Sequence, residues 1–258
     1  MSAVLLRLRQ GDRPIQLAIL LWALTMIATP IVRWTVGDGA LGVMINLGVL
    51  TQAAAVVTVL IRWAGFGSTL RIILPILLIA WSAEFLGSRT AFPFGPYAYT
   101  AALQPQLGGV PLLVPLAWLM MLPPSWAVAE TILGPRRLPQ ALSQRVARAA
   151  LAALAFTAWD LFLDPQMVAW DLWRWPGGGA YFGVPLTNYL GWLLVSFLIG
   201  LFLIPGRLPL LPLLTIYAVT WVLTFFGQVF FWGLPGPALC GFLGMGGMLA
   251  WALLRRPK

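Results

Sequence analysis

The sequence predicts an all-α fold, a polytopic transmembrane helical bundle of about eight spans with both termini cytoplasmic. Of its 258 residues, 60% are hydrophobic and only 9% are charged, whereas a soluble protein carries about 25% charged residues. The mean hydropathy of +0.89, with 14 Trp and 14 Phe, is typical of a helical membrane protein. We expect residues 1–258 to form a single multi-pass domain in the cell membrane.

Eight apolar segments are long enough to span a bilayer, which takes about 17–25 residues. They cover residues 15–36, 40–62, 69–88, 110–133, 146–164, 186–204, 209–231 and 235–254. Little sequence is left for a separate soluble domain.

The distribution of positive charge supports this count of spans. If the N-terminus is cytoplasmic, only Arg33, Arg89 and Arg174 fall on the outer side. The inner side holds Arg7, Arg9, Arg13, Arg62, Arg71, Arg136, Arg137, Arg145, Arg148, Arg207, Arg255, Arg256 and Lys258. Cytoplasmic loops of membrane proteins are enriched in Arg and Lys, so this asymmetry predicts that both termini lie inside.

Two connections are longer than the others, and both fall on the predicted outer side. They cover residues 88–109 and 164–185, and Pro and Gly interrupt both, so neither is a regular span. Both are rich in aromatic residues and contain Arg, a composition that suits the headgroup level of a bilayer. We expect these two outer loops to form the functional site.

Three carboxylates lie near the ends of the spans that precede these loops. Glu84 ends the third span, and Asp160 and Asp164 end the fifth. A charge at the centre of a membrane helix costs roughly 2.5–3.5 kcal/mol on insertion scales, so such residues usually have a partner or a task. The spacing of four residues places both aspartates on one helix face. Burial and the negative end of the helix dipole disfavour ionisation, and we expect at least one acid to be protonated.

Each of these acids also has a purely structural interpretation. Asp164 before Pro165 has the pattern of an N-cap and first residue of a short interfacial helix. Glu84 could form an ion pair with Arg89. Asp160 lies deepest and has no nearby cation in the sequence, so its structural interpretation is the weakest.

The remaining acids have structural interpretations. Asp171 beside Arg174 suggests a solvated loop pair. Glu130, near Arg136 and Arg137, suggests an interfacial anchor on the cytoplasmic side. Asp12 and Asp38 are expected in turns.

Uncharged polar and aromatic residues flank the same loops. Asn188, which opens the sixth span, either caps that helix or holds a water molecule. A cluster of tryptophans usually forms a belt at the membrane interface, although some of the rings could instead face inward and line a pocket. The cluster consists of Trp159, Trp170, Trp173, Trp175 and Trp192.

Composition excludes several classes of chemistry. The chain contains no histidine, which rules out imidazole catalysis and most zinc and non-haem iron sites. A single cysteine, Cys240, cannot build an internal disulfide framework. The net charge of +9 is scattered among apolar spans and does not indicate nucleic acid as a partner. We therefore expect no metal and no cofactor.

The chemical groups that remain are carboxylic acids, aromatic rings and water. This set suits protonation of an electron-rich alkene to a tertiary carbocation, which water then captures or which loses a proton. Three rings at roughly 2 kcal/mol each would supply about 6 kcal/mol, while enzymes lower barriers by about 8–23 kcal/mol. A preorganised anion must therefore contribute, so we expect two carboxylates in different protonation states.

The two loops and the helices beside them resemble the carotenoid hydratase family, which includes carotenoid 1′,2′-hydratases and bisanhydrobacterioruberin hydratases. The similarity covers about residues 81–192, and Ala91 stands where the family pattern leads us to expect glycine. The matching segments are Glu84-Phe85-Leu86-Gly87, Phe92-Pro93-Phe94-Gly95-Pro96-Tyr97-Ala98-Tyr99, Gly109-Val110-Pro111, Trp159-Asp160-Leu161-Phe162-Leu163-Asp164-Pro165-Gln166-Met167, Trp173-Arg174-Trp175, and Tyr181-Phe182-Gly183-Val184-Pro185-Leu186-Thr187-Asn188-Tyr189-Leu190-Gly191-Trp192.

The resemblance implies an integral membrane enzyme that hydrates the terminal 1′,2′ double bond of an acyclic carotenoid, giving a tertiary alcohol. Its partners would be a carotenoid in the bilayer, membrane lipid and other enzymes of carotenoid biosynthesis. Asp160 is then the expected proton donor, and Asp164 or Glu84 the cation partner or water base. The residues expected to position substrate, water or the acids are Asn188, Arg89, Tyr97, Tyr99, Trp159, Trp175, Tyr181 and Trp192.

Two other functions use the same residues. A carotenoid end-group cyclase also begins with protonation but then loses a proton. Membrane cyclases carry a Pro-x-Glu-Glu/Asp motif, and neither Glu84 nor Glu130 has that context. A lipid transporter or proton-coupled transporter could use the acids as a relay, although such proteins often have repeated halves and we see no repeat here.

Overall fold

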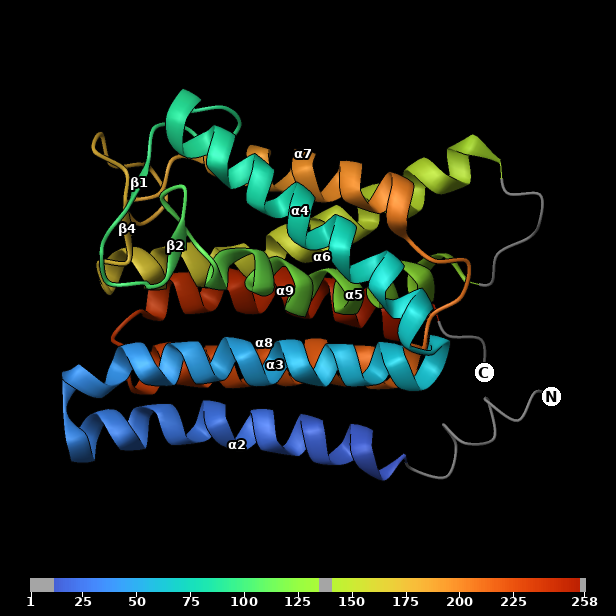
Figure 1. Ribbon diagram of the computed structural model, residues 1–258, viewed down its shortest axis with the longest axis horizontal. Helices are drawn as coiled ribbons and strands as arrows, with labels where there is room; N and C mark the ends of the chain where they lie inside the picture. The colour runs from blue at the N-terminus through green and yellow to red at the C-terminus, as the bar shows by residue number, and fades with distance from the viewer. Residues whose placement is uncertain (1–11, 135–140, 256–258) are drawn as a thin grey trace.

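The computed structural model describes residues 12–134 and 141–255, which form a bundle of eight long helices (Figure 1). Each of the eight is long and apolar enough to cross a membrane, so the predicted all-α, multi-pass fold is confirmed. The helices are α2 (Arg13–Val36), α3 (Leu41–Ala64), α4 (Phe66–Thr90), α5 (Leu113–Leu133), α6 (Leu142–Ala169), α7 (Leu186–Leu203), α8 (Leu210–Phe230) and α9 (Pro235–Leu254).

Short turns join most of the helices. Asp12 is the N-cap residue of α2, and its carboxylate accepts a hydrogen bond from Arg62 at 2.8 Å. Asp38 opens a 3-10 turn, η1 (Asp38–Ala40), between α2 and α3, as predicted. Its carboxylate pairs with Arg33.

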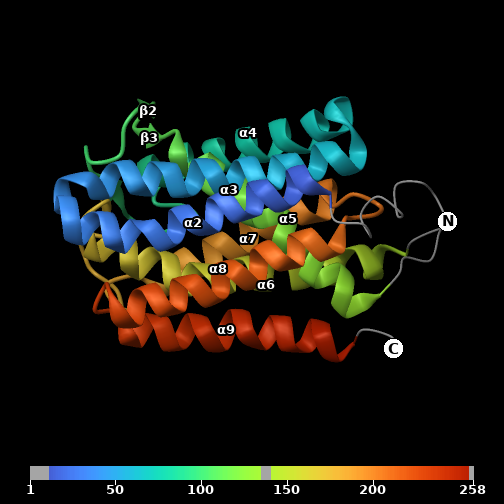
Figure 2. The same cartoon turned by 90° about the horizontal axis from the view of Figure 1, so that it is seen from below.

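Helix α5 lies at the centre of the bundle and α2 at its edge. In their apolar windows, 83% of the α5 residues are buried but only 17% of the α2 residues. A helix that is hydrophobic all round belongs in the interior of a bundle or in lipid, and here the two helices illustrate the two cases. Figures 1 and 2 show α2 beside α3 at the margin of the bundle.

Helix α6 is longer than expected, because the predicted span 146–164 ended at Asp164. The helix continues through Pro165 to Ala169, so the interpretation of Asp164 and Pro165 as the start of a separate interfacial helix is wrong. Pro165 has no N–H to donate to the carbonyl of Leu161. The hydroxyl of Tyr181 donates to that carbonyl instead, at 3.0 Å.

The two predicted loops lie together at one end of the bundle (Figure 1). Strand β1 (Ala98–Tyr99) pairs with β4 (Trp173–Arg174) in antiparallel register, with Tyr99 opposite Trp173. A second ladder joins β2 (Gln106–Leu107) to β3 (Val110–Pro111) within the first loop. We call this the loop end of the bundle.

The charge asymmetry has a structural counterpart. Of the described cations, Arg33, Arg89 and Arg174 lie at the loop end, while the others lie on the segments at the opposite end (Figure 1). Helix α2 begins and α9 ends at that opposite end. The assignment of this end to the cytoplasm stays a prediction.

Candidate active site

Three carboxyl groups predicted to act together are buried at the loop end. Glu84 extends from α4, and Asp160 and Asp164 extend from α6. Their exposed fractions are 3%, 0% and 2%. Among the described residues, no Arg or Lys forms an ion pair with any of them, although buried charges normally need compensation.

Glu84 is held by three donors from two other segments. The hydroxyls of Tyr97 and Tyr99 both donate to Glu84 Oε2, at 2.6 and 2.7 Å. The indole of Trp118 on α5 donates to Oε1 at 3.1 Å. Hydrogen bonds to a carboxylate offset part of the cost of burying its charge, so these donors take the place of a cation.

The loop strands explain why Tyr97 and Tyr99 converge. Successive side chains of an extended segment point to opposite faces, so Tyr97 and Tyr99 share one face and Ala98 points away. Trp173 and Trp175 share a face in the same way, and Arg174 between them is exposed. Pairing of β1 with β4 places the Tyr99 ring against the Trp173 ring, with 5.8 Å between centroids.

Both tyrosines remain donors. Burial, followed by the nearby charge of Glu84, raises the pKa of Tyr97 and the pKa of Tyr99 far above the ordinary value. Each hydroxyl therefore keeps its proton. The tyrosine pair is a permanent source of hydrogen bonds to Glu84.

Asp160 and Asp164 share a single amide. Asn188 Nδ2 donates to Asp160 Oδ2 at 3.1 Å and also to Asp164 Oδ2. The predicted common face of the two aspartates is confirmed, because one residue of α7 reaches both. Asn188 does not cap α7 with its side chain, so the capping interpretation is wrong. Asp160 Oδ1 has no hydrogen-bond partner among the described residues.

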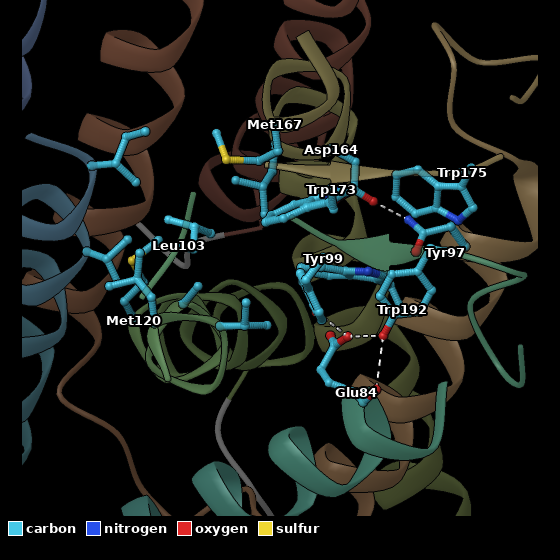
Figure 3. A pocket seen from close by; sticks show the side chains of 17 residues that line it. Glu84, Tyr97, Tyr99, Leu103, Met120, Asp164, Met167, Trp173, Trp175 and Trp192 are labelled. Atoms are coloured by element: carbon cyan, nitrogen blue, oxygen red, sulfur yellow. Dashed lines mark hydrogen bonds between the residues drawn. The ribbon is translucent and has the colours of Figure 1, made fainter. Parts of the chain in front are cut away.

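Glu84 and Asp164 line one cavity of about 60 Å³, which we call the acid cavity (Figure 3). In Figure 3 the two acids enter from different helices, with aromatic rings between them. The volume has room for a few water molecules. Five more predicted positioning residues line this cavity, namely Asn188, Tyr97, Tyr99, Trp175 and Trp192.

Asp160, the predicted proton donor, is not among the residues that line the acid cavity. It lies one helical turn before Asp164, on the far side of the shared amide of Asn188. Asp164 therefore lines the cavity directly, whereas Asp160 is connected to it through Asn188.

Arg89 lies outside this cluster, and its predicted pairing with Glu84 is wrong. Its guanidinium donates to the carbonyls of Phe85 and Gly108 at 3.2 and 2.9 Å. It also lies 3.6 Å from the centroid of the Phe85 ring. Arg89 thus attaches the first loop to the end of α4 and does not hold the acids.

Tyr181 and Trp159 flank the site without lining the acid cavity. Tyr181 satisfies the Leu161 carbonyl described above, one residue beyond Asp160. Trp159 is 3% exposed and packs against Trp192, with 5.9 Å between ring centroids. Both support α6 where it carries the aspartates.

Most tryptophans of the predicted cluster face inward. Trp159, Trp173, Trp175 and Trp192 are each at most 8% exposed, so for these four the interpretation as an interface belt is wrong. The rings of Trp173, Trp175 and Trp192 line the acid cavity, as in the alternative interpretation. Trp170 is only partly buried and contacts Trp232, with 5.0 Å between centroids.

Three residues at or near the site were not among those predicted to act in catalysis or to position substrate, water or the acids. Trp118 donates to Glu84, Trp173 lines the acid cavity, and the hydroxyl of Tyr189 is buried without a partner among the described residues. The alternation in Trp173-Arg174-Trp175 was a signal for Trp173. Trp118 carries no comparable signal, because its contact depends on how α5 packs against α4.

Phe94 fixes the first loop to the helices. Its ring, 1% exposed, fits between two glycines. A Cβ at Gly87 would lie 2.6 Å from Phe94, and one at Gly191 would lie 2.7 Å from both Phe94 and the carbonyl oxygen of Pro93. The close approach of this loop to α4 and α7 therefore requires glycine at both positions, and it holds Tyr97 in reach of Glu84.

Charged residues on the loop surface play a different part. Asp171 and Arg174 form an exposed ion pair, as predicted. The hydrogen bond from Arg174 lowers the pKa of Asp171 and raises the pKa of Arg174. Neither residue reaches the acid cavity.

Comparison with known proteins identifies the family of this chain. The chain is similar to the bisanhydrobacterioruberin hydratase of Haloarcula japonica, with 33% identity over 118 residues, which are 45% of this chain and 38% of that protein. The match thus spans well under half of the length of that relative. No solved structure matches the chain. The model of the family described as carotenoid biosynthesis protein matches residues 42–248, and the chain belongs to this family.

Proposed function

We propose that this protein is a carotenoid hydratase of the cell membrane. It would add water across the terminal 1′,2′ double bond of an acyclic carotenoid end group and give a tertiary alcohol. The observation that carries the proposal is the acid cavity, in which Glu84 and Asp164 face a space lined by aromatic rings. Membership of a carotenoid biosynthesis family and similarity to a named hydratase support it.

In this mechanism Asp160 and Asp164 hold one proton between them. Both accept from the single amide of Asn188, and two ionised carboxylates at such a site repel each other. A shared proton removes that repulsion, as it does in other carboxylate pairs. Asp164 lines the cavity and is the group that delivers the proton to substrate. Asp160 positions it and supports its change of charge.

Glu84 is the fixed anion of the mechanism. Its three donors, Tyr97, Tyr99 and Trp118, stabilise the ionised carboxylate before the reaction begins. Preorganised charge of this kind acts on the transition state without a reorganisation cost at the moment of reaction. We assign to Glu84 the stabilisation of the carbocation and the orientation of the attacking water.

The reaction then has two steps. Asp164 gives its proton to the alkene carbon that carries one hydrogen, and the π-electron pair forms the new C–H bond, which leaves a tertiary cation on the neighbouring carbon. Water attacks that cation through an oxygen lone pair, forms the C–O bond and returns one proton to the Asp164 carboxylate. One water is consumed, the acid is regenerated, and nothing is oxidised or reduced.

The aromatic lining supplies part of the stabilisation. Tyr97, Tyr99, Trp173, Trp175 and Trp192 all face the cavity. A desolvated cation–π contact is worth about 2 kcal/mol or more, so three productive rings would contribute about 6 kcal/mol. Enzymes need about 8–23 kcal/mol, and we attribute the remainder to Glu84 and to general acid catalysis by Asp164.

The test is expression of the full chain in a host that accumulates an acyclic carotenoid with unmodified ends, such as lycopene. We expect extracted pigment heavier by one water at each hydrated end, and no such pigment from Asp164→Asn at equal protein level. A product of unchanged mass with a cyclised end would assign the site to a cyclase. Unmodified pigment together with proton-dependent lipid flux into liposomes would assign it to a transporter.

A further inference from the structure

A second, larger cavity lies beside the acid cavity. It has a volume of about 270 Å³ and is enclosed by α2, α3, α6 and α8, with Met120 of α5 at one side. We call it the tail cavity. It is lined mainly by aliphatic and aromatic side chains, and none of its lining residues is charged.

The two cavities share a wall. Ile45 and Val49 of α3, Met120 of α5 and Leu163 of α6 line both of them. Leu163 directly precedes Asp164, so the boundary lies next to the proposed proton donor. A ligand that crosses this boundary meets apolar side chains only.

The tail cavity runs along the bundle from the loop end towards the middle. On α8 and the turn after it, the lining extends from Thr220 to Trp232. At 1.5 Å per helical residue, Thr220 to Phe230 corresponds to about 15 Å, or about half of the roughly 30 Å hydrocarbon thickness of a bilayer. The cavity therefore has the length of half a membrane-spanning rod.

The deep end of the tail cavity contains the polar residues Gln52 and Thr220, whose side chains form hydrogen bonds within the protein. Gln52 Nε2 donates to Thr220 Oγ1 and to Met121 Sδ, each at 3.1 Å. Thr220 Oγ1 in turn donates to the Ile216 carbonyl at 2.9 Å. An apolar ligand in contact with these groups breaks none of their hydrogen bonds, so it avoids the cost of an unpaired buried polar group.

One wall of the tail cavity belongs to the helix with the least burial. Met26, Ile27, Pro30 and Ile31 of α2 line it, and Ile27 and Ile31 are also 48% and 53% exposed at the surface of the bundle. At these positions an apolar part of α2 lies between the cavity and the surroundings of the bundle. The occupant therefore enters from a hydrocarbon phase and not from water.

We propose that the tail cavity binds the uncharged hydrocarbon chain of a linear polyisoprenoid whose terminal double bond lies in the acid cavity. The proposal rests on the proposed function and narrows its substrate class. The chain next to the reacting end must be acyclic and carry no substituent beyond its methyl branches. A ring or charged group within about 15 Å of that end does not fit.

Gly48 allows a direct test. It lines the tail cavity on α3, and a Cβ added there meets no atom within 4 Å, so the first atom of a new side chain fits and Gly48→Phe places a ring in the cavity. Gly42→Phe is the matched control, because a Cβ at Gly42 also meets no atom within 4 Å and Gly42 lines neither cavity. A second pair of variants lies on α8. Thr224 lines the tail cavity and Val222 does not, so Thr224→Phe is the test and Val222→Phe is its control.

Binding is measured first, with chemistry arrested by Asp164→Asn in every variant. Detergent-solubilised full-length protein is incubated with lycopene, and the pigment that co-elutes in gel filtration is quantified from its visible absorbance. We expect Gly48→Phe and Thr224→Phe to weaken binding about tenfold or more and the two controls to match the parent. If both cavity variants bind as tightly as their controls, the proposal is wrong.

Turnover is measured second, with Asp164 intact. We expect Gly48→Phe to lose hydration of lycopene and to keep hydration of a short isoprenoid alkene with the same terminal group. Equal losses on both substrates would overturn the proposal. If no protein hydrates either substrate but the binding difference persists, the proposed function fails and the tail cavity stands.

Discussion

Buried carboxylates occur at both ends of this bundle, and the two ends treat them differently. At the end opposite the loops, Glu130 is 8% exposed and accepts a hydrogen bond from Arg148 at 2.6 Å. At the loop end, no Arg or Lys of the described residues pairs with Glu84 or Asp164, which accept hydrogen bonds from hydroxyl, indole and amide groups. The same kind of side chain is neutralised by a cation in one place and held by neutral donors in the other.

The difference distinguishes an acid that stabilises the fold from acids that can take part in a reaction. A buried carboxylate paired with a guanidinium has its charge compensated, and removal of the partner costs stability. A carboxyl group among neutral donors can keep, give and regain a proton. Glu130 was predicted to be an interfacial anchor near Arg136 and Arg137, which lie outside the described residues. Its pairing with Arg148 makes it part of the helix packing between α5 and α6.

The largest expected effect is the loss of hydration activity when an acid at the loop end is replaced. Asp164→Asn removes the proton that the alkene receives, and general acid catalysis is typically worth about 10²–10⁴-fold. We expect hydration per folded protein to fall by that factor, measured as product formed from lycopene in detergent. Glu130→Gln is the matched control and should hydrate at the parental rate once corrected for the folded fraction. Equal losses in the two variants would erase the distinction between the ends.

The next largest effect is a loss of stability when the ion pair at the opposite end is removed. Arg148→Met removes a buried cation and leaves its carboxylate partner with less compensation, which typically costs about 3–5 kcal/mol. We expect a lower unfolding temperature, followed by tryptophan fluorescence in detergent. The double variant Glu130→Gln with Arg148→Met should recover part of the loss, because neither side chain of this pair is then charged. A double variant less stable than Arg148→Met would contradict this account of the pair.

A smaller effect probes the fixed anion. Glu84→Gln keeps the size of the side chain but removes the charge that faces the cavity, and loss of one preorganised electrostatic group costs about 10²–10³-fold in rate. The variant should bind lycopene like the parent and fail in turnover. Tyr99→Phe, which removes one of three donors to Glu84, should lose less. A Glu84→Gln enzyme with parental turnover would remove Glu84 from the mechanism.

Much of this architecture follows from the sequence. Apolar length defined eight spans because a helix in hydrocarbon must satisfy its own backbone. The spacing of Asp160 and Asp164 placed both on one face. The predicted end of α6 was wrong because a proline such as Pro165 usually marks a helix boundary. Here the Leu161 carbonyl, which receives no hydrogen bond from Pro165, accepts one from Tyr181 in the second loop. Local sequence cannot reveal a partner that tertiary packing supplies.

The same reason limits what could be predicted within the site. Glu84 and Arg89 are close in the sequence and could have formed an ion pair, yet hydrogen bonds from Tyr97 and Tyr99 satisfy the acid instead. Those bonds require β1 to pair with β4, a contact between segments more than 70 residues apart. Asp160 was ranked above Asp164 because it lies deeper in the span. Which of the two meets the cavity depends on the rotation of α6 against its neighbours.

The smallest expected effect is a change in stability at the loop end when a residue other than the acids is replaced. Ala91 follows α4 with a φ of 64°, a left-handed conformation that disfavours residues with a Cβ. This explains why the resemblance led us to expect glycine there. Ala91→Gly should raise the free energy of unfolding by about 1 kcal/mol and leave turnover unchanged. A less stable variant would show that the methyl group has a packing role.

Isotope transfer from solvent tests the central claim most directly, namely that an enzyme-held proton and then a water molecule add to the alkene. The purified protein converts lycopene in deuterated water and, separately, in water labelled with oxygen-18, and the products are analysed by mass spectrometry. We predict one non-exchanging deuterium on the carbon next to the carbinol carbon and one oxygen derived from water, with neither product formed by Asp164→Asn. An alcohol without that deuterium, or with oxygen from another source, would contradict the account.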